Sequence, residues 1–192
     1  MMQSVSCCEC ETSATREEGF THISLPSIAR HSLPCLLSHH LSPSRISGVG
    51  EKYDCSHCLT KTEARVTHTI TCPPRLLLLH LRKGCGAAGG GLAAIPERLS
   101  LARWCRGAGG GGALAPNYSL VSCVVHVGST PRCGHYTAAC RVPGQGWVHM
   151  DDSSCQVMSN GAMSRLMSPL EEGGKGDVGQ ASVYMAFYDC DS

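Results

Sequence analysis

The sequence contains few aromatic residues and carries almost no net charge. Phe, Trp and Tyr make up 5% of its 192 residues, and the formal net charge is +1. A chain without an extended basic field is not attracted to a nucleic-acid backbone, so direct nucleic-acid binding is not expected. Hydrophobic residues still make up 42% of the chain, which is enough for one folded domain or a large part of one.

Long apolar segments are also absent. The longest run, Leu76–Leu79, falls far below the roughly 20 residues that a membrane helix needs. The first residues lack the charged start and the apolar core of a secretory signal peptide. We therefore expect a soluble, intracellular protein that does not bind membranes.

Cysteine, by contrast, is abundant, with 14 residues in the chain. Cys7 and Cys10 form one Cys-x-x-Cys pair, and Cys55 and Cys58 form a second. In a reducing compartment such pairs indicate metal rather than disulfides, and tetrahedral Zn²⁺ accepts four thiolates whatever the distance between the pairs in sequence. The spacing predicts a structural zinc site; the alternative is two chance pairs in a cysteine-rich chain.

A second motif joins His135, which follows Gly134, to Asp151 and Asp152. The residues between them have strand composition around a Pro-Gly-Gln-Gly turn at 143–146, which predicts a β-hairpin. Such a hairpin returns Asp151 towards His135, where a carboxylate can orient an imidazole and stabilise its cation. The alternatives are a histidine that only packs or caps, and carboxylates that are solvated turn residues.

Hydrophobic periodicity predicts further strands and helices. The expected strands cover 20–26, 61–71, 76–81, 95–101, 118–127 and 181–188, and the expected helices cover 32–41 and 158–167. The continuous apolar run at 76–81 predicts burial on both faces, with His80 as a hydrogen-bonded core residue. The Gly-rich segments 84–91 and 107–112, and residues 128–131, are expected to be loops.

Taken in order, these landmarks resemble the C-terminal half of a ubiquitin-specific protease domain. The matching strings are Cys7-x-x-Cys10, Ile23-Ser24-Leu25-Pro26, Cys55-x-x-Cys58, Pro73-Pro74-x-Leu76-x-Leu78, Tyr118-x-Leu120, Val124-Val125-His126-x-Gly128, Gly134-His135-Tyr136-Thr137-Ala138, Trp147, Asp151-Asp152-Ser153 and Ala181-x-x-Tyr184-x-x-Phe187-Tyr188. The resemblance implies an α+β, papain-like cysteine peptidase with a mostly antiparallel palm sheet and zinc-bearing fingers. It divides the chain into fingers at 1–72 and palm at 73–192, with the N-terminal thumb missing.

The resemblance also implies an activity and its residues. The family hydrolyses the isopeptide or peptide bond after the C-terminal Gly of ubiquitin, with His135 as the general base, Asp151 as its orienting acid and Asp152 in a supporting role. The four knuckle cysteines would hold the structural zinc of the fingers. Residues Gly128, Gly134 and Tyr136 would lie beside the ubiquitin tail.

The same resemblance suggests partners and a location. Ubiquitin and ubiquitinated proteins are the expected partners. A nearer likeness to one member of the family adds a WD-repeat activator, a nuclear as well as cytosolic location, and a role in DNA repair.

The sequence departs from the family pattern at the nucleophile. The family's Cys box opens a helix near the start of the domain, and no such string occurs here; Cys133 is expected to be an incidental thiol. Three interpretations stay open. The chain is a fragment of an active deubiquitinase, an inactive pseudoenzyme that binds ubiquitin, or a zinc-stabilised interaction domain.

Overall fold

A computed structural model describes residues 1–26, 31–48, 50–82, 94–105, 116–130, 133–167 and 181–191. These residues form fourteen strands and two helices, and the chain divides into two compact units. Unit 1 takes residues 1–20 and 38–73 with the segment that starts at Leu101, and unit 2 takes 21–37, 74–100 and the residues from 116 onward. The Gly-rich segments predicted at 84–91 and 107–112 lie outside the described residues.

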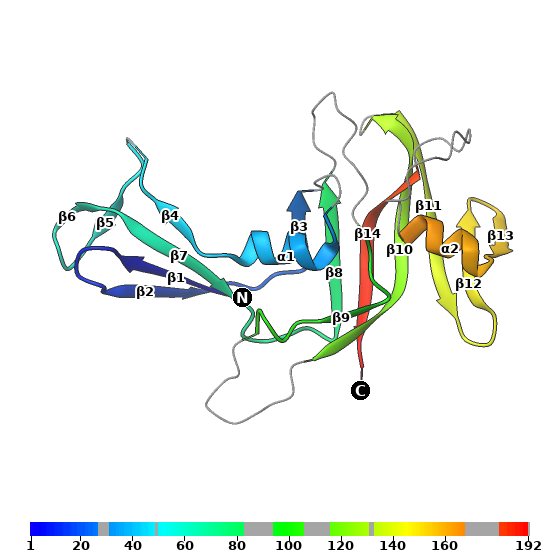
Figure 1. Cartoon of the computed structure of the whole chain (residues 1–192), viewed down its shortest axis with the longest axis horizontal. Helices are drawn as coiled ribbons and strands as arrows, with labels where there is room; N and C mark the ends of the chain where they lie inside the picture. The colour runs from blue at the N-terminus through cyan, green and yellow to red at the C-terminus, as the bar shows by residue number, and fades with distance from the viewer. Residues whose placement is uncertain are drawn as a thin grey trace. The chain divides into compact units, whose positions relative to one another are not determined.

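Unit 1 is built from short antiparallel strands (Figure 1). Its strands are β1 (Met2–Cys7), β2 (Ser13–Glu17), β4 (Ser44–Ile46), β5 (Tyr53–Cys55), β6 (Thr60–Thr62) and β7 (Ala64–Thr69). Four of them form one sheet in the order β2-β1-β7-β4, and β5 pairs with β6 as a separate hairpin. The sheet buries Ala64 and Val66, which alternate with the exposed Arg65, so one face is apolar and the other is polar.

Unit 2 is dominated by one larger sheet. Its strands are β3 (Ile23–Pro26), β8 (Leu76–Arg82), β9 (Arg98–Ser100), β10 (Asn117–Thr130), β11 (Cys133–Val142), β12 (Gly146–Asp151), β13 (Ser154–Val157) and β14 (Ala181–Cys190). Seven follow the order β13-β12-β11-β10-β14-β8-β3, and β9 pairs with β10. Every pairing is antiparallel except that of β3 with β8.

Two helices complete the described residues. Helix α1 (Leu33–Leu41) buries Leu33, Leu36, Leu37 and Leu41, whose spacing puts them on one face. Helix α2 (Asn160–Met167) is capped by Ser159, whose Oγ accepts a hydrogen bond from the Ala162 amide at 3.2 Å. Neither described helix has the length and apolar character needed to cross a membrane.

The structure confirms most of the expected elements and corrects their limits. The hairpin around 143–146 is present, with positive φ at Gly144 and Gly146, as that turn requires. The strand expected at 61–71 is divided into β6 and β7. Residues 128–130, expected as a loop, instead continue β10.

The expectation that 76–81 is buried on both faces is wrong. Leu77, Leu79 and Leu81 are buried, whereas Leu76 is 51% exposed and Leu78 is half-buried. Buried and more exposed leucines alternate along this strand, because a sheet covered on one face buries only every second residue. His80 is only partly satisfied: its Nδ1 lies 3.0 Å from Ser24 Oγ, while its buried Nε2 has no partner among the described residues.

Two buried tyrosines tie the centre of the unit 2 sheet to the segments beside it. The hydroxyl of Tyr118 donates to the Pro74 carbonyl at 2.5 Å, and that of Tyr188 donates to the Pro96 carbonyl at 2.6 Å. Both side chains are fully buried. Burial raises the pKa of the Tyr188 hydroxyl, so it remains a protonated donor.

We predict that Tyr188→Phe lowers the free energy of unfolding by about 1 kcal/mol, because the Pro96 carbonyl loses its donor. Urea denaturation followed by circular dichroism measures the change. Tyr136→Phe serves as the control, because that tyrosine is exposed. Equal stability of the Tyr188→Phe variant and the unmodified chain would contradict the assigned hydrogen bond.

Candidate functional site

The hairpin formed by β11 and β12 brings His135 and Asp151 together. The register pairs Ala138 with Met150, so one further step places Asp151 opposite Thr137. His135, two residues before Thr137 on the same face of β11, then occupies the diagonal position that side chains can bridge. The result is a contact of 2.5 Å between Nε2 of His135 and Oδ1 of Asp151.

The contact changes the acidity of His135. The hydrogen bond and the charge of Asp151 raise the pKa of His135 above its ordinary value of 6.5, with a further contribution from the charge of Asp152. The two side chains of the pair are 49% and 44% exposed, so water screens part of this interaction. Because His135 makes no other hydrogen bond among the described residues, its Nδ1 is available to a third group.

Asp152 lies in the two-residue turn between β12 and β13. Its φ is 48°, a left-handed conformation that Asp tolerates better than most residues. Ligand atoms of Asp152, Asp151 and His135 all lie within 4.8 Å of one another. Asp152 therefore adds negative charge beside the His135–Asp151 pair and is not its hydrogen-bond partner.

Gly128 and Gly134 leave space for a buried histidine. The two residues lie on the facing strands β10 and β11, and His126 packs between their backbones. A Cβ on Gly134 would lie 2.6 Å from the Val127 carbonyl oxygen, and one on Gly128 would lie 2.5 Å from that of Cys133. Any larger residue would displace the backbone that leads into His135.

Tyr136 is nearly half exposed and points to the other face of β11 from His135. Its ring lies 4.9 Å from that of His126 and 5.4 Å from that of Tyr184, measured between centroids. Residues 128, 134 and 136 are thus neighbours around His126, which sequence reasoning did not select as a site residue. In the sequence, the feature that could have identified His126 is its position two residues before Gly128.

No thiol accompanies His135 among the described residues. Cys133 is exposed and forms no hydrogen bond there, although it lies two residues from His135 on the same strand. The described part of the chain therefore contains a hydrogen-bonded pair of His135 and Asp151, and no described thiol forms a hydrogen bond to His135.

The second candidate site lies in unit 1, where two similar turns face each other. Cys7 ends β1 and Cys55 ends β5, and each sulfur accepts a hydrogen bond of 3.4 Å from an amide of its own turn. Glu11 lies four residues after Cys7, and Leu59 lies four residues after Cys55; both adopt a positive φ. The amide of Glu11 donates a hydrogen bond to the carbonyl of Cys7, and the amide of Leu59 donates one to the carbonyl of Cys55. Both turns therefore direct two sulfurs to the same side.

These turns bring all four predicted cysteines together. The Sγ atoms of Cys7, Cys10, Cys55 and Cys58 all lie within 4.8 Å of one another. Cys7 and Cys58 are 3.9 Å apart, and Cys10 and Cys55 are 3.6 Å apart. Four sulfurs placed tetrahedrally about zinc, at a Zn–S distance of about 2.3 Å, are separated by about 3.8 Å, so the donor set fits this metal.

The thiols of the cluster differ in their acidity. A hydrogen bond from Thr62, together with backbone amides, lowers the pKa of Cys7 to about 6. The pKa of Cys58 is raised to about 12, because its thiol donates to Cys10 and is partly buried. Because zinc binds cysteine as the thiolate, a zinc ion at the centre would favour deprotonation of all four thiols. The sequence did not indicate the role of Thr62.

Comparison with known proteins assigns the family. The model of the family described as "Ubiquitin carboxyl-terminal hydrolase" matches residues 1–188. The chain belongs to this family. Ubiquitin carboxyl-terminal hydrolase 4 of Arabidopsis thaliana is 27% identical over 86% of the chain and 46% of its own length. Ubiquitin carboxyl-terminal hydrolase 1 of Mus musculus is 28% identical over 90% of the chain and 25% of its own length.

Solved structures support the fold. The SAGA Ubp8/Sgf11/Sus1/Sgf73 DUB module bound to ubiquitin aldehyde contains a chain similar to this one, with a TM-score of 0.76 and 22% identity, covering 100% of this chain and 40% of that chain. The module bound to monoubiquitin gives a TM-score of 0.75 and 21% identity, with the same coverage. The α+β, papain-like fold with a mostly antiparallel sheet is thereby confirmed. The chain spans less than half the length of these ubiquitin carboxyl-terminal hydrolases.

We predict that Asp151→Asn lowers the pKa of His135 towards 6.5, because the substitution removes the carboxylate that stabilises the imidazolium. NMR titration of the ring Cε1–H signal, assigned with His135→Gln, measures the shift. The attraction between His135 and Asp151 contributes to stability fully below pH 6.5, and this contribution disappears as pH rises through the raised pKa.

Asp152→Asn is the matched control for this titration. It should lower the pKa of His135 less than Asp151→Asn does, because Asp152 acts through charge alone. An equal effect of both variants would contradict the assignment of Asp151 as the hydrogen-bond partner.

Proposed function

We propose that the chain carries the base and orienting acid of a thiol-dependent deubiquitinase. The observation that supports this most directly is the 2.5 Å contact between His135 Nε2 and Asp151, which leaves Nδ1 available. Membership of the ubiquitin carboxyl-terminal hydrolase family supplies the reaction class. The substrate bond is the isopeptide or peptide bond after the C-terminal Gly of ubiquitin.

In this proposal His135 serves a cysteine that lies outside the 192 residues. Nδ1 of His135 accepts the thiol proton, and Asp151 stabilises the resulting imidazolium. The thiolate attacks the carbonyl carbon of the ubiquitin terminal Gly, the imidazolium protonates the departing lysine amine, and a thioester remains. His135 then takes a proton from water, which hydrolyses the thioester and releases the ubiquitin carboxylate. Asp152 adds negative charge that favours the imidazolium.

We assign supporting roles to the remaining parts of the chain. The fingers, predicted at 1–72, and the palm, predicted at 73–192, would both contact ubiquitin. Gly128, Gly134 and Tyr136 would lie beside the ubiquitin tail. Cys7, Cys10, Cys55 and Cys58 would hold a structural zinc ion, which crosslinks the two turns of unit 1 when bound. A WD-repeat activator, a nuclear location and a role in DNA repair remain predictions.

A second candidate function is ubiquitin binding without cleavage. It is favoured by the absence of a thiol in contact with His135 in the part of the chain that the structure describes. A third, a zinc-stabilised domain that binds another partner, depends on the cysteine cluster alone.

Catalysis is tested on the longest protein that the transcript encodes, with ubiquitin coupled to aminomethylcoumarin as substrate. We predict that His135→Ala lowers kcat/KM by at least about 10³-fold, because the thiol loses its base. The control is His39→Ala, which removes an exposed histidine of α1. Equal activity of the His135→Ala variant and the unmodified protein would contradict the proposed base.

A measurement of ubiquitin binding by the 192-residue chain distinguishes the ubiquitin-binding pseudoenzyme from the zinc-stabilised interaction domain. Titration of labelled ubiquitin, followed by NMR, should show saturable binding without cleavage if the chain contains the fingers and palm of a deubiquitinase. Binding by the chain, combined with inactivity of the longest encoded protein, would favour the pseudoenzyme. Failure of the folded chain to bind ubiquitin, combined with inactivity of the longest encoded protein, would favour the interaction domain.

Zinc is tested by elemental analysis of the purified chain. We predict one zinc ion per chain, its loss in Cys10→Ser, and its retention in Cys8→Ser, because Cys8 is not part of the sulfur cluster. Chelation should unfold unit 1, since metal binding contributes directly to the folding of such sites. A chain that contains no zinc and stays folded with a chelator would contradict the site.

A further inference from the structure

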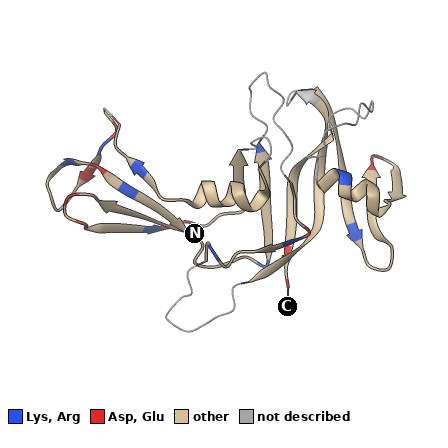
Figure 2. Cartoon of the chain, in the orientation of Figure 1, with Lys and Arg blue, Asp and Glu red and all other residues tan. Residues whose placement is uncertain are grey.

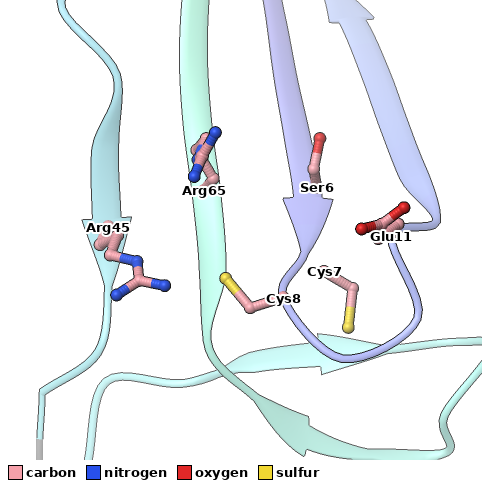
Figure 3. Close-up of a pocket in the computed structure, with 6 residues that line it drawn as sticks. All are labelled: Ser6, Cys7, Cys8, Glu11, Arg45 and Arg65. Atoms are coloured by element: carbon pink, nitrogen blue, oxygen red, sulfur yellow. The ribbon is translucent and has the colours of Figure 1, made fainter.

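A row of four polar side chains crosses one face of the sheet in unit 1. The strand register places Ser13 opposite Ser6, Ser6 opposite Arg65, and Arg65 opposite Arg45. Residues in one row of an antiparallel sheet point to the same face, with Cβ atoms of neighbours about 5 Å apart. Figure 3 shows Arg45, Arg65 and Ser6 on their adjacent strands β4, β7 and β1.

The two arginines of this row have no acidic partner. The ion pairs formed by other arginines of the described chain are Arg16–Glu18, Arg75–Asp189 and Arg98–Asp191. Arg45 and Arg65 form none with any described carboxylate, although Figure 2 shows basic positions next to each other on β4 and β7. Like charges placed directly opposite across two strands repel each other, and no ion pair among the described residues offsets that cost.

The row borders a pocket of about 330 Å³. The pocket is lined by Ser6, Cys7, Cys8, Glu11, Arg45 and Arg65, all of them in unit 1. Its volume is at the lower end of the range for small-molecule sites. The lining thus provides two guanidinium groups, one hydroxyl and two thiols, with Glu11 as its single carboxylate.

We propose that this pocket binds a phosphate group, held between Arg45 and Arg65. Guanidinium groups present planar pairs of N–H donors that match phosphate oxygens, and two adjacent arginines can each bind one edge of the anion. The anion also removes the repulsion between the arginines, and Ser6 Oγ can donate a further hydrogen bond. In Figure 3, Glu11 lies across the pocket from Arg45, next to the β1–β2 turn, so the arginine side remains open to an anion.

Two kinds of ligand could supply this phosphate group. One is free inorganic phosphate, and the other is a phosphorylated serine on a protein segment. Both would use the same arginines, so the site is tested first with inorganic phosphate and then with a phosphoserine peptide.

The experiment is a titration of the zinc-loaded full chain with inorganic phosphate, at constant ionic strength maintained with sodium chloride. NMR shifts of backbone amides in β1, β4 and β7 report binding. We expect saturable shifts, and at least a fivefold loss of affinity in each of Arg45→Gln and Arg65→Gln. Both variants should keep the melting temperature of the unmodified chain or exceed it, because each removes a repulsion; this separates loss of binding from unfolding.

Two further variants test whether phosphate binding is specific to this pocket. Glu11→Gln should bind phosphate more tightly, because it removes the pocket's negative charge. Arg16→Gln is the matched control, since Arg16 belongs to the same sheet but to the opposite face and is paired with Glu18. Unchanged affinity in Arg16→Gln combined with the losses at Arg45 and Arg65 supports the site.

Equal losses in Arg16→Gln and Arg45→Gln, or shifts that sodium chloride alone reproduces, would overturn the proposal, because they would indicate general charge attraction. Tighter binding of a phosphoserine peptide than of inorganic phosphate would identify a phosphorylated protein as the source of the group. Equal affinity would identify free phosphate.

Discussion

The candidate catalytic pair depends on the register between β11 and its two neighbours. Pairing with β12 sets the distance from His135 to Asp151, and pairing with β10 closes the backbone around His126. A shift of one residue along β11 would turn His135 to the other face of the sheet. Gly128 and Gly134 help to maintain this register, because a side chain at either position would push apart the strands β10 and β11.

The sequence predicted the parts of this arrangement that have a local signal. The Pro-Gly-Gln-Gly turn at 143–146 indicated the hairpin, and the hairpin indicated that Asp151 would approach His135. The Cys-x-x-Cys spacing indicated a cluster of four sulfurs, because each turn fixes its own pair. Periodic leucines indicated α1, and the strands at the centre of the larger sheet were found from their β-branched and aromatic residues.

Other features had no local signal. Strand β2 is exposed throughout, so it has no hydrophobic alternation, and β1 is mostly Ser, Gln and half-buried Val. The leucine run at 76–81 could not show which face of β8 is covered, because that depends on strands far away in sequence. The packing of His126 between two glycines, and the hydrogen bond of Thr62 to Cys7, join residues that only the folded chain brings together.

The cysteine cluster has a consequence for the length of the chain between its two turns. Its contacts join Cys7 to Cys58 and Cys10 to Cys55, so a metal bound there closes a long loop of polypeptide. The entropy lost on closing a loop grows only logarithmically with its length, by about 0.6 kcal/mol for each doubling. Loops of unit 1 between the two turns can therefore gain or lose residues at little thermodynamic cost, as long as both turns keep their geometry. Among the described residues, the exposed ones between β4 and β5 are where insertions would be tolerated best, because they pack against no core.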